Sequence, residues 1–346
     1  MKRKIILSGL IIGSVMLSGC NSTNSSTVAQ AGVALSEGDY ENAKILYQRS
    51  LAEDTDREGA YRGMGLASLN LRDYDTAIEC FENALHESNG IIKDIDIDIS
   101  YYLAVAMHKA GKVDDAIKVL DSVIAIRPAS DTAYYMRGKI RLIGKDESGA
   151  KADYDKAIEI APTNYDHYLR ISEDLKSAGY DEDSRMYVDR AISAGGKMPD
   201  AVKGVFEYCS GSYTDARNDL EKARKSSDSE TVSLYLGRTY EALGDLDYAI
   251  GIYQEAITKF PDSGKLYNQL AVTKLNGKDY NGAIEVIENG ILNGNGESMQ
   301  SLLYNRVVAY ENVYDFDTAT KYMKEYIEKY PDDANAQREY LFLSTR

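Results

Sequence analysis

Tryptophan is absent from this chain, and proline, phenylalanine and cysteine are rare, at five, five and three of 346 residues. The scarcity of proline suits a helical chain, because proline removes a backbone donor and clashes with the preceding helical turn. Three cysteines exclude the dense disulfide framework of a small secreted domain. Cys80 and Cys209 fall on predicted helices far apart in the chain, so we interpret them as small buried hydrophobic side chains.

Residues that build catalytic and metal sites are also few. The three histidines, His86, His108 and His167, do not have the spacing of metal ligands. The sequence has no recognisable nucleophile motif of Ser, His and Asp and no glycine-rich loop that would hold a phosphate group. We therefore predict that the chain is not an enzyme and binds no metal or cofactor.

One acidic stretch needs a separate explanation. Residues 93–99 read KDIDIDI, and the alternating Asp94, Asp96 and Asp98 resemble the start of a calcium-binding loop. Ile99 replaces the glycine that such a loop requires, and Val105 stands where the twelfth position needs glutamate. We favour the commoner explanation, in which acidic residues precede the N-terminus of a helix.

Negative charge dominates the body of the chain. The formal net charge is −15, and the first 20 residues hold three cations and no acid, which leaves −18 on the remainder. Nucleic acid is not expected as a partner, because phosphate groups need a cationic surface. The same charge favours a soluble body that is held off an anionic membrane surface.

The amino terminus has a different character. A basic start at residues 2–4 precedes a 13-residue apolar run, Ile5–Leu17, which is too short to span a bilayer stably and fits a signal peptide. Residues 17–20 (LSGC) then resemble the cleavage box of bacterial lipoproteins. The resemblance implies that residues 1–19 are a signal peptide and that Cys20 is lipidated.

Lipidation would decide where the protein resides. Two acyl chains attach a protein stably to a membrane, and residues 20–28 would then be the lipidated cysteine and a polar tether. We expect lipid anchoring in the cell membrane, on its extracytoplasmic face. A plain secretory peptide and an uncleaved anchor are the alternatives.

A 34-residue pattern organises the rest of the chain. In Asp131–Asn164 a large residue, a glycine, an alanine, an aromatic residue, an alanine and a proline stand at fixed offsets. The pattern resembles the tetratricopeptide repeat family, which implies a pair of antiparallel helices in each repeat. Small residues allow the two helices to approach, large ones fill the space beside them, and proline follows the second helix. The six residues are Tyr134, Gly138, Ala150, Tyr154, Ala157 and Pro162.

The pattern recurs nine times. A small residue begins the buried face of each second helix, at spacings of 34, 39, 34, 34, 32, 33, 34 and 36, and a bulky residue follows four positions later. We predict an all-α fold: a right-handed α-solenoid of about nine repeats over residues 29–333, with a capping helix at 334–346 that turns Tyr340 and Leu341 inward. The small residues are Ala43, Ala77, Ala116, Ala150, Ser184, Ala216, Ala249, Ala283 and Ala319, and the bulky ones are Tyr47, Phe81, Leu120, Tyr154, Val188, Leu220, Tyr253, Ile287 and Met323.

In this family the first helices line a concave groove, and the resemblance implies which positions face a ligand. Those positions hold six cations and five acids, so the groove is close to neutral while the body is acidic. We infer that repeats two to four bind an extended segment with apolar or aromatic side chains and some carboxylates. The alternative is that the groove merely tolerates these residues. The candidate groove residues are Arg62, Tyr101, His108, Lys109, Tyr135, Lys139, Lys176, Arg238, Asn268 and Tyr304.

The resemblance implies a scaffold that binds a peptide or protein segment in its groove. A lipoprotein that captures a solute or glycan at the cell surface is the alternative, but the chain has no tryptophan for stacking and no long insertion between repeats. One binding mode of the family is excluded. The clamp for carboxylate tails begins with Lys and Asn four residues apart, and no Lys-x-x-x-Asn occurs in the chain.

Overall fold

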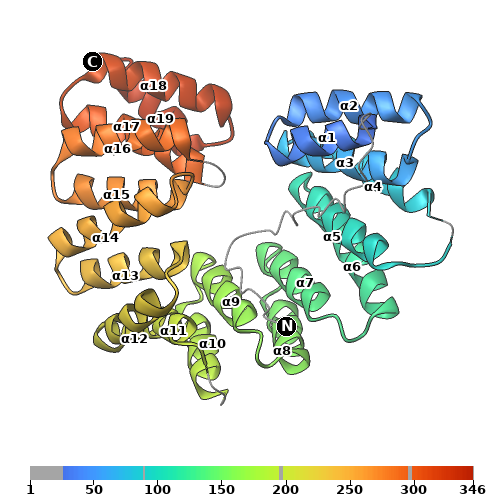
Figure 1. The fold of residues 1–346 in the computed structure, drawn as a ribbon, viewed down its shortest axis with the longest axis horizontal. Coiled ribbons are helices and arrows are strands. Elements are labelled where there is room, and N and C mark those ends of the chain that lie inside the picture. Colours follow the sequence, from blue (N-terminus) through green and yellow to red (C-terminus); the bar gives the residue numbers. More distant parts are fainter. Residues whose placement is uncertain (1–25, 89, 195–197, 295–297, 346) are drawn as a thin grey trace. The chain divides into compact units, whose positions relative to one another are not determined.

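The structure, a computed structural model, describes residues 26–88, 90–194, 198–294 and 298–345. Within these ranges it contains nineteen α-helices and no β-strand, which confirms the predicted all-α solenoid. Consecutive helices pack against one another from α1 to α9 and from α11 to α19, so the hydrophobic core is divided among the repeats (Figure 1). The chain divides into two compact units, Met1–Tyr187 and Val188–Arg346.

The helices alternate between the first and second members of each repeat. The first unit and the boundary helix comprise α1 (Thr27–Ser36), α2 (Tyr40–Ala52), α3 (Arg57–Asn70), α4 (Tyr74–His86), α5 (Asp94–Lys109), α6 (Val113–Ile126), α7 (Asp131–Ile143), α8 (Glu147–Ile160), α9 (Tyr165–Ser177) and α10 (Asp181–Ser193). The second unit continues with α11 (Asp200–Ser210), α12 (Tyr213–Ser226), α13 (Glu230–Ala242), α14 (Leu246–Lys259), α15 (Gly264–Asn276), α16 (Tyr280–Asn293), α17 (Met299–Asn312), α18 (Phe316–Lys329) and α19 (Ala334–Leu343).

The predicted packing positions of the second helices are confirmed, since all nine small residues and all nine bulky residues are buried. In repeat four, Gly138 of α7 faces Tyr154 of α8, and a Cβ added to the glycine would lie 2.8 Å from the tyrosine ring. Gly65, Gly204 and Gly237 lie in the same way against Phe81, Leu220 and Tyr253. Glycine therefore occurs where a large ring or branched side chain leaves no room for a side chain.

The two cysteines of the described chain lie in different environments. Cys80 in α4 is buried, as predicted, and burial raises the pKa of its thiol to about 11. Cys209 in α11 is only half-buried, which corrects the prediction that both are buried. Cys20 and the apolar run Ile5–Leu17 lie outside the described residues. In the part of the chain that is described, no helix has both the length and the apolar character needed to cross a bilayer.

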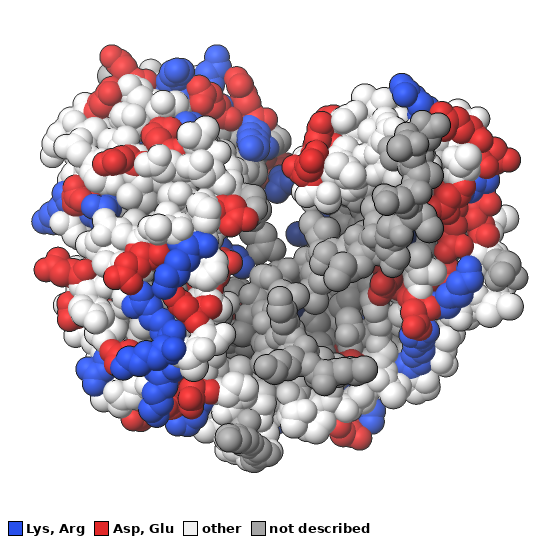
Figure 2. Space-filling model, viewed as in Figure 1, with Lys and Arg blue, Asp and Glu red and all other residues white. Residues whose placement is uncertain are grey.

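Charged side chains of both signs are interspersed on the surface, and lysines and arginines gather over α12 (Figure 2, lower left). Lys222 Nζ lies 2.6 Å from Asp219 Oδ1 in the same helix. Arg224 Nη2 lies 2.5 Å from Glu255 Oε2 of α14. These ion pairs reduce the positive charge that the patch presents to a phosphate backbone.

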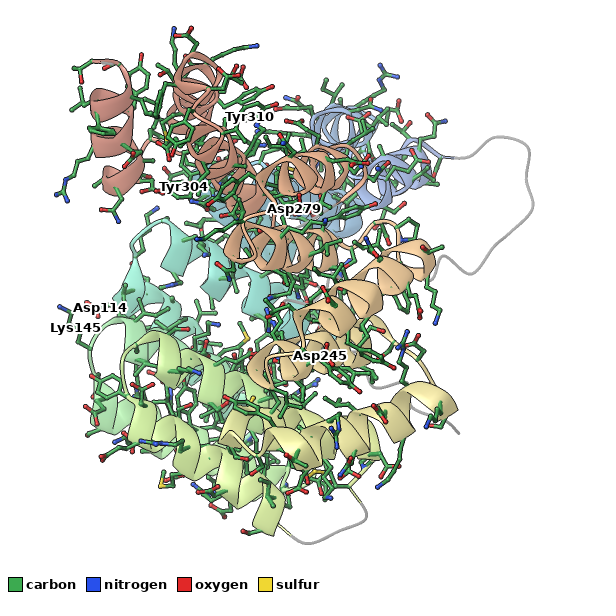
Figure 3. The ribbon with its side chains drawn as sticks, turned by 90° about the vertical axis from the view of Figure 1, so that its left-hand side faces the viewer. Asp114, Lys145, Asp245, Asp279, Tyr304 and Tyr310 are labelled. Carbon is green, nitrogen blue, oxygen red and sulfur yellow. The ribbon has the colours of Figure 1, made fainter. Side chains whose placement is uncertain are left out.

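A residue with left-handed backbone conformation lies in the turn inside each repeat, and in six of the nine turns the next residue is aspartate. Asp245 and Asp279 cap α14 and α16, where their carboxylates accept hydrogen bonds from the N–H groups of Tyr248 at 3.2 Å and Gly282 at 3.0 Å (Figure 3). The glycine of the turn usually has the positive φ, as in Gly244, where φ is 86°. In repeat eight, however, Gly277 keeps a helical φ and the following residue, Lys278, adopts φ of 63°.

The ends of the repeat array differ in detail from expectation. α1 begins at Thr27, within the range 20–28 predicted as a tether. α19 buries Ala336 and Leu343, leaves Tyr340 half-buried, and exposes 66% of Leu341. The prediction that Leu341 points inward is therefore wrong. Ala336, Tyr340 and Leu343 follow the i, i+4, i+7 spacing of one helical face, and Leu341 falls off that face.

Candidate binding groove

First helices of successive repeats contribute the candidate groove residues. In the first unit, Lys139 Nζ of α7 lies 2.8 Å from Asp174 Oδ1 of α9, and the hydroxyl of Tyr135 donates to Asp174 Oδ2 at 3.0 Å. Tyr135 is buried and stacks on the ring of His167 at 5.2 Å between centroids. Lys139 and Tyr135 therefore already share one carboxylate, which reduces what they offer to a ligand.

The other predicted residues of this unit are less closely linked. His108 of α5 is half-buried, and burial, followed by the charges of Lys109 and Lys139, lowers its pKa, so its ring is neutral at pH 7. The hydroxyl of Tyr101 shares a 2.7 Å hydrogen bond with the hydroxyl of Ser130. Arg62 in α3 is half-buried, and its Nε has no hydrogen-bond partner among the described residues. Lys109 and Lys176 are exposed.

In the second unit, hydrogen bonds join neighbouring first helices directly. Arg238 Nε of α13 donates to Gln269 Oε1 of α15 at 3.0 Å, and Gln269 Nε2 donates to Glu241 Oε2 of α13 at 3.1 Å. Asn305 Nδ2 of α17 donates to Asn268 Oδ1 of α15 at 2.9 Å. A row of amide side chains thus crosses from one repeat to the next.

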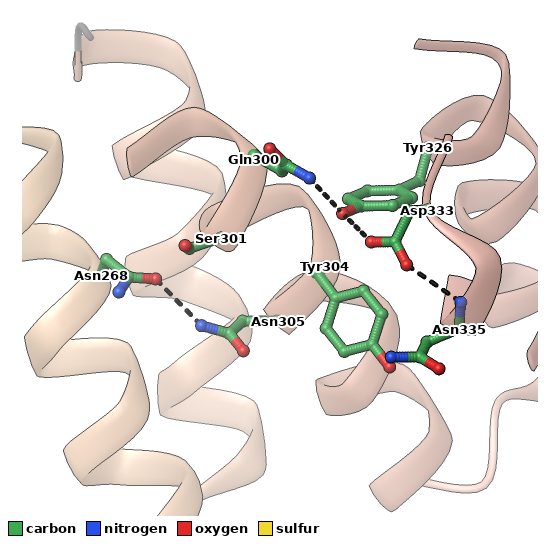
Figure 4. A pocket seen from close by; sticks show the side chains of 8 residues that line it. All are labelled: Asn268, Gln300, Ser301, Tyr304, Asn305, Tyr326, Asp333 and Asn335. Atoms are coloured by element: carbon green, nitrogen blue, oxygen red, sulfur yellow. Dashed lines mark hydrogen bonds between the residues drawn. The ribbon is translucent and has the colours of Figure 1, made fainter. Parts of the chain in front are cut away.

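A polar pocket of about 520 Å³ lies at the end of this row (Figure 4). It brings two of the predicted groove residues, Asn268 and Tyr304, together with six that the sequence analysis did not single out. Its walls come from α15, α17, α18 and α19, and side chains from three consecutive first helices face the same space. The other six lining residues are Gln300, Ser301, Asn305, Tyr326, Asp333 and Asn335.

Part of the pocket is held rigidly. Gln300 Nε2 donates to the hydroxyl of Tyr326 at 2.9 Å, and that hydroxyl donates to Asp333 Oδ2 at 2.8 Å (Figure 4). Asp333 accepts hydrogen bonds from the N–H group of Ala336, the hydroxyl of Tyr326 and the N–H group of Asn335. These hydrogen bonds hold the pKa of Asp333 below its usual range. Burial raises the pKa of Tyr326 to about 12. Asp333 is therefore ionised and Tyr326 neutral at any physiological pH.

The remaining polar groups of the pocket are available to a ligand. The side-chain oxygen of Asn268 accepts the hydrogen bond from Asn305. The N–H groups of Asn268 and the side-chain oxygen of Asn305 can therefore still bind a ligand. Within the described chain, the hydroxyls of Ser301 and Tyr304 make no side-chain hydrogen bond. Burial, followed by Glu339, Glu311 and Asp333, raises the pKa of Tyr304, so the surroundings are acidic. The pocket therefore combines neutral donors and acceptors with a negative potential.

Sequence reasoning could have found part of this pocket. Gln300, Ser301, Tyr304 and Asn305 have the spacing of one helical face, and three of them are polar residues in a helix whose other face is buried. No spacing rule reveals that Asp333, the N-cap of α19, reaches Tyr326 of α18, because that contact depends on how the last helix packs.

The described residues contain no group of three or more His, Cys, Asp or Glu side chains that could hold a metal ion. The acidic residues were predicted to precede a helix. Asp94 and Asp96 instead lie in the first turn of α5. Asp94 is paired with Arg127 at 2.5 Å, whereas Asp96 is buried, so the two carboxylates serve different contacts.

Comparison with known families agrees with this architecture. Models of the tetratricopeptide repeat match residues 68–140, 131–164 and 231–263. The second of these ranges coincides with the 34-residue pattern of Asp131–Asn164. The chain therefore contains tetratricopeptide repeats, whose fold is typical of scaffolds that bind proteins and peptides.

Individual relatives are distant. Superkiller protein 3 of Saccharomyces cerevisiae (strain ATCC 204508 / S288c) is 25% identical over 147 residues, which are 42% of this chain and 10% of that protein. The chain thus spans about a tenth of the length of this curated relative. The structure of yeast Tom70 aligns with 86% of this chain and 66% of its own at 14% identity and a TM-score of 0.58, which supports the fold. A tetratricopeptide repeat protein from Parabacteroides merdae ATCC 43184 aligns with 84% of this chain and 99% of its own, at 14% identity and a TM-score of 0.49.

Proposed function

We propose that this protein is a lipid-anchored scaffold on the extracytoplasmic face of a cell membrane, and that it binds an extended segment of a partner protein. The binding part is carried by one observation: Asn268, Tyr304 and Asn335 reach one pocket from three consecutive first helices. The anchor rests on the sequence alone, namely the apolar run Ile5–Leu17 and Cys20.

Side-chain amides suit a peptide backbone. Each residue of an extended chain presents one N–H group and one C=O group, and an Asn or Gln side chain can meet both. After their mutual bond, Asn268 keeps N–H groups and Asn305 keeps an oxygen that can fill these two roles. Such recognition holds a segment in place without requiring a particular side chain, while the ring of Tyr304 adds apolar contact.

The charges indicate which segments would bind. Glu311, Glu339 and Asp333 surround Tyr304, so a basic residue beside the pocket would be favoured over a carboxylate. In repeats two to four, Lys139 is already paired with Asp174. We therefore place recognition in repeats eight and nine and the cap rather than in repeats two to four, and we expect it to prefer basic segments.

Selection of peptides from a random display library on the full chain tests this proposal. The selected peptides are expected to bind Asn305→Ala and Tyr304→Ala at least about tenfold more weakly than the wild type, a loss of ~1.4 kcal/mol. Asn312→Ala is the matched control, because Asn312 lies on the same helix and is exposed. Its side chain donates a hydrogen bond to the carbonyl of Val308 in that helix.

The variants also locate the site. Peptides that bind all three variants equally would disprove recognition in the pocket. Peptides lost on Lys139→Glu but kept on Asn305→Ala would return the site to repeats two to four. Circular dichroism of each variant separates a lost contact from a lost fold.

A second function is favoured by the same lining. Amides, hydroxyls, an aromatic ring and a carboxylate without an opposing cation also match a polyhydroxylated ligand, which would make the protein a lipoprotein that captures glycans. Calorimetric titration with soluble oligosaccharides distinguishes the two, since a saccharide that binds the wild type and not Tyr304→Ala would support capture. We further propose that the chain has no catalytic activity of its own.

A further inference from the structure

A second pocket lies in the first unit, where the repeat spacing is irregular. The small residues that begin the buried faces of the second helices in repeats two and three, Ala77 and Ala116, are 39 residues apart, whereas the repeat pattern is 34 residues long. The structure divides this expansion between a longer helix and a longer connector. α5 has 16 residues, whereas α3 and α7 have 14 and 13, and the connector covers residues 87–93 instead of the shorter 53–56 and 127–130.

A cavity of about 270 Å³ lies beside this expansion, between α4, α5 and α6. Its wall is mostly aliphatic, with Leu85 from α4, Leu103 from α5, and Val119 and Val123 from α6. This volume lies just below the ~300–1,000 Å³ typical of small-molecule pockets, so it suits one large side chain better than a whole ligand.

A carboxylate forms part of this apolar wall. Asp96 is only 5% exposed, and its Oδ2 accepts a hydrogen bond from the N–H group of Lys93 at 2.6 Å. Its Oδ1 is buried and has no hydrogen-bond partner among the described residues, although Asp96 lines the pocket. A buried acceptor without a hydrogen bond destabilises the fold, so a donor placed in the pocket would offset that penalty.

The hydroxyl groups of the pocket cannot supply the missing donor. Ser100 Oγ donates to the carbonyl of Asp96 at 2.7 Å, and Ser122 Oγ donates to the carbonyl of Lys118 at 2.9 Å. Each hydroxyl has a single proton, so both serines are left with acceptor capacity alone. The polar groups of the wall therefore call for an occupant that brings donors, and the carboxylate favours a positive one.

The mouth of the pocket is also apolar. Ile92 and Ile126 line it and are 51% and 49% exposed, and the neighbouring Ile91 is 69% exposed. Exposed isoleucines that gather at a pocket are a mark of an interaction surface. Isoleucines at the mouth and a carboxylate within match the aliphatic stem and cationic head of a lysine or arginine side chain.

We propose that this pocket is a second docking site, separate from the amide-lined pocket, and that it takes one lysine or arginine side chain of a partner protein. The aliphatic stem lies against Leu85, Ile92 and Ile126, and the head donates to Asp96 Oδ1 and to the two serine oxygens.

Small cations can probe the site on the full chain. n-Butylammonium and n-propylguanidinium reproduce the two side chains, and n-butanol and butanoate are the neutral and anionic controls. In the methyl NMR spectrum of the labelled protein, the two cations are expected to shift Leu85, Ile92, Val119, Val123 and Ile126 at concentrations about tenfold below those at which n-butanol does. If n-butanol produced the same shifts at the same concentrations as the cations, the pocket would recognise only apolar groups and the proposal would be overturned. The absence of any shift would also overturn it.

Two variants separate recognition from folding. Asp96→Asn keeps the acceptor for Lys93 and is expected to weaken cation binding at least about tenfold. Ser122→Phe fills the pocket without touching Asp96 and should abolish binding. Thr258→Phe is its control, because Thr258 is exposed on α14 and makes the same bond to the carbonyl four residues earlier. Unchanged cation binding in Asp96→Asn would contradict the proposed role of the carboxylate.

The occupant can be distinguished from its rivals. A blocked Gly-Gly-Lys-Gly-Gly peptide should produce the same shifts, and its norleucine analogue should not. If the free amine binds and the peptide does not, a protein partner is excluded. If the chain instead forms a dimer that Ser122→Phe dissociates in sedimentation, the occupant is a second copy of this chain, and the proposal of a different partner fails.

Discussion

Glycines of the first helices decide how closely the two helices of a repeat approach. Gly138 and Gly237 lie under the rings of Tyr154 and Tyr253, both of which are fully buried. In an isolated helix a glycine is unfavourable relative to alanine, so these positions give up helix propensity for close packing.

Two glycine substitutions should therefore change stability in opposite directions, depending on whether the added methyl group has room. Gly237→Ala should lower the free energy of unfolding by about 1–3 kcal/mol, because the added methyl group meets the Tyr253 ring. Gly251→Ala in α14 should raise it by up to about 1 kcal/mol, since nothing lies within 4 Å of the added Cβ. Urea unfolding monitored by circular dichroism measures both. Stabilisation by both substitutions would show that the close contact does not limit packing.

The carboxylate of Asp131 predicts a pH dependence. Its bond to His167 Nε2 at 3.0 Å, aided by Asn164 Nδ2 at 3.1 Å, holds the pKa of Asp131 at about 2, below an ordinary 3.8. A carboxyl whose pKa is lowered by folding contributes stability above pH 3.8 and loses it as the pH falls through about 2.

The thermal midpoint of Asp131→Asn should therefore lie below that of the wild type at pH 7, and the gap should close as the pH falls from 3.8 to about 2. Scanning calorimetry across this range provides the measurement, with Asp332→Asn as an exposed control. A gap that persists at the lowest pH would mean that Asp131 acts through packing rather than through its charge.

At the scale of elements, the turn between the two helices of a repeat uses one backbone conformation throughout. In each of the nine turns a single residue has a positive φ between 62° and 86°. Five of these residues are glycine, while the other four are Arg72, Lys145, Lys278 and Tyr314. The left-handed conformation costs a residue with a Cβ roughly 1–2 kcal/mol, so those four turns carry strain that packing of the repeats offsets.

Exchanging the two kinds of residue should change stability in opposite directions. Gly244→Ala should lower the free energy of unfolding by about 1 kcal/mol, although the added Cβ has open space around it. Lys278→Gly should relieve strain and leave stability equal or higher, by up to about 1 kcal/mol. Midpoints of urea unfolding at unchanged slope would show both effects. Equal changes of the same sign would indicate that the turn conformation does not control stability.

At the scale of the whole molecule, the acidic body and the proposed anchor have complementary roles. A net charge of −18 beyond residue 20 gives the repeats no electrostatic attraction to an anionic membrane. Attachment would then depend on the lipid at Cys20, which would leave the repeat surfaces accessible to partners.

Fractionation of cells that produce the full chain tests the anchor. The wild type should remain with the membrane after washing in high salt, whereas Cys20→Ala should lose the lipid and the cleavage that depends on it. Metabolic labelling with a fatty acid should mark the wild type and Cys209→Ala but not Cys20→Ala. Labelling of Cys20→Ala, or no labelling of the wild type, would contradict lipidation at this position.

The repeat architecture could be predicted from the sequence because its causes are local. Helix pairs follow from the periodic placement of small, bulky and turn residues, and these positions are buried as the pattern indicates. Even Gly65, Gly138, Gly204 and Gly237, which meet their bulky partners some sixteen residues further on, obey a spacing that lies within one repeat.

The candidate sites could not be predicted to the same degree, because they depend on contacts between repeats. The sequence predicts that the charge of Lys139 is available to a ligand, but Lys139 forms an ion pair with Asp174, one repeat away. The expectation that Leu341 points inward fails because the cap presents Ala336, Tyr340 and Leu343 to α18.

The sequence alone determined the helix pairs, their number and the positions that they bury, since residues one helical turn or one short turn apart must meet. The tertiary structure decided which side chains from different repeats share a space. Asn268 meets Asn305, and Asp96 keeps an unsatisfied oxygen in an aliphatic pocket, because of the way one helix pair is set against the next. That register is the sum of many side-chain contacts, and no single spacing in the sequence encodes it.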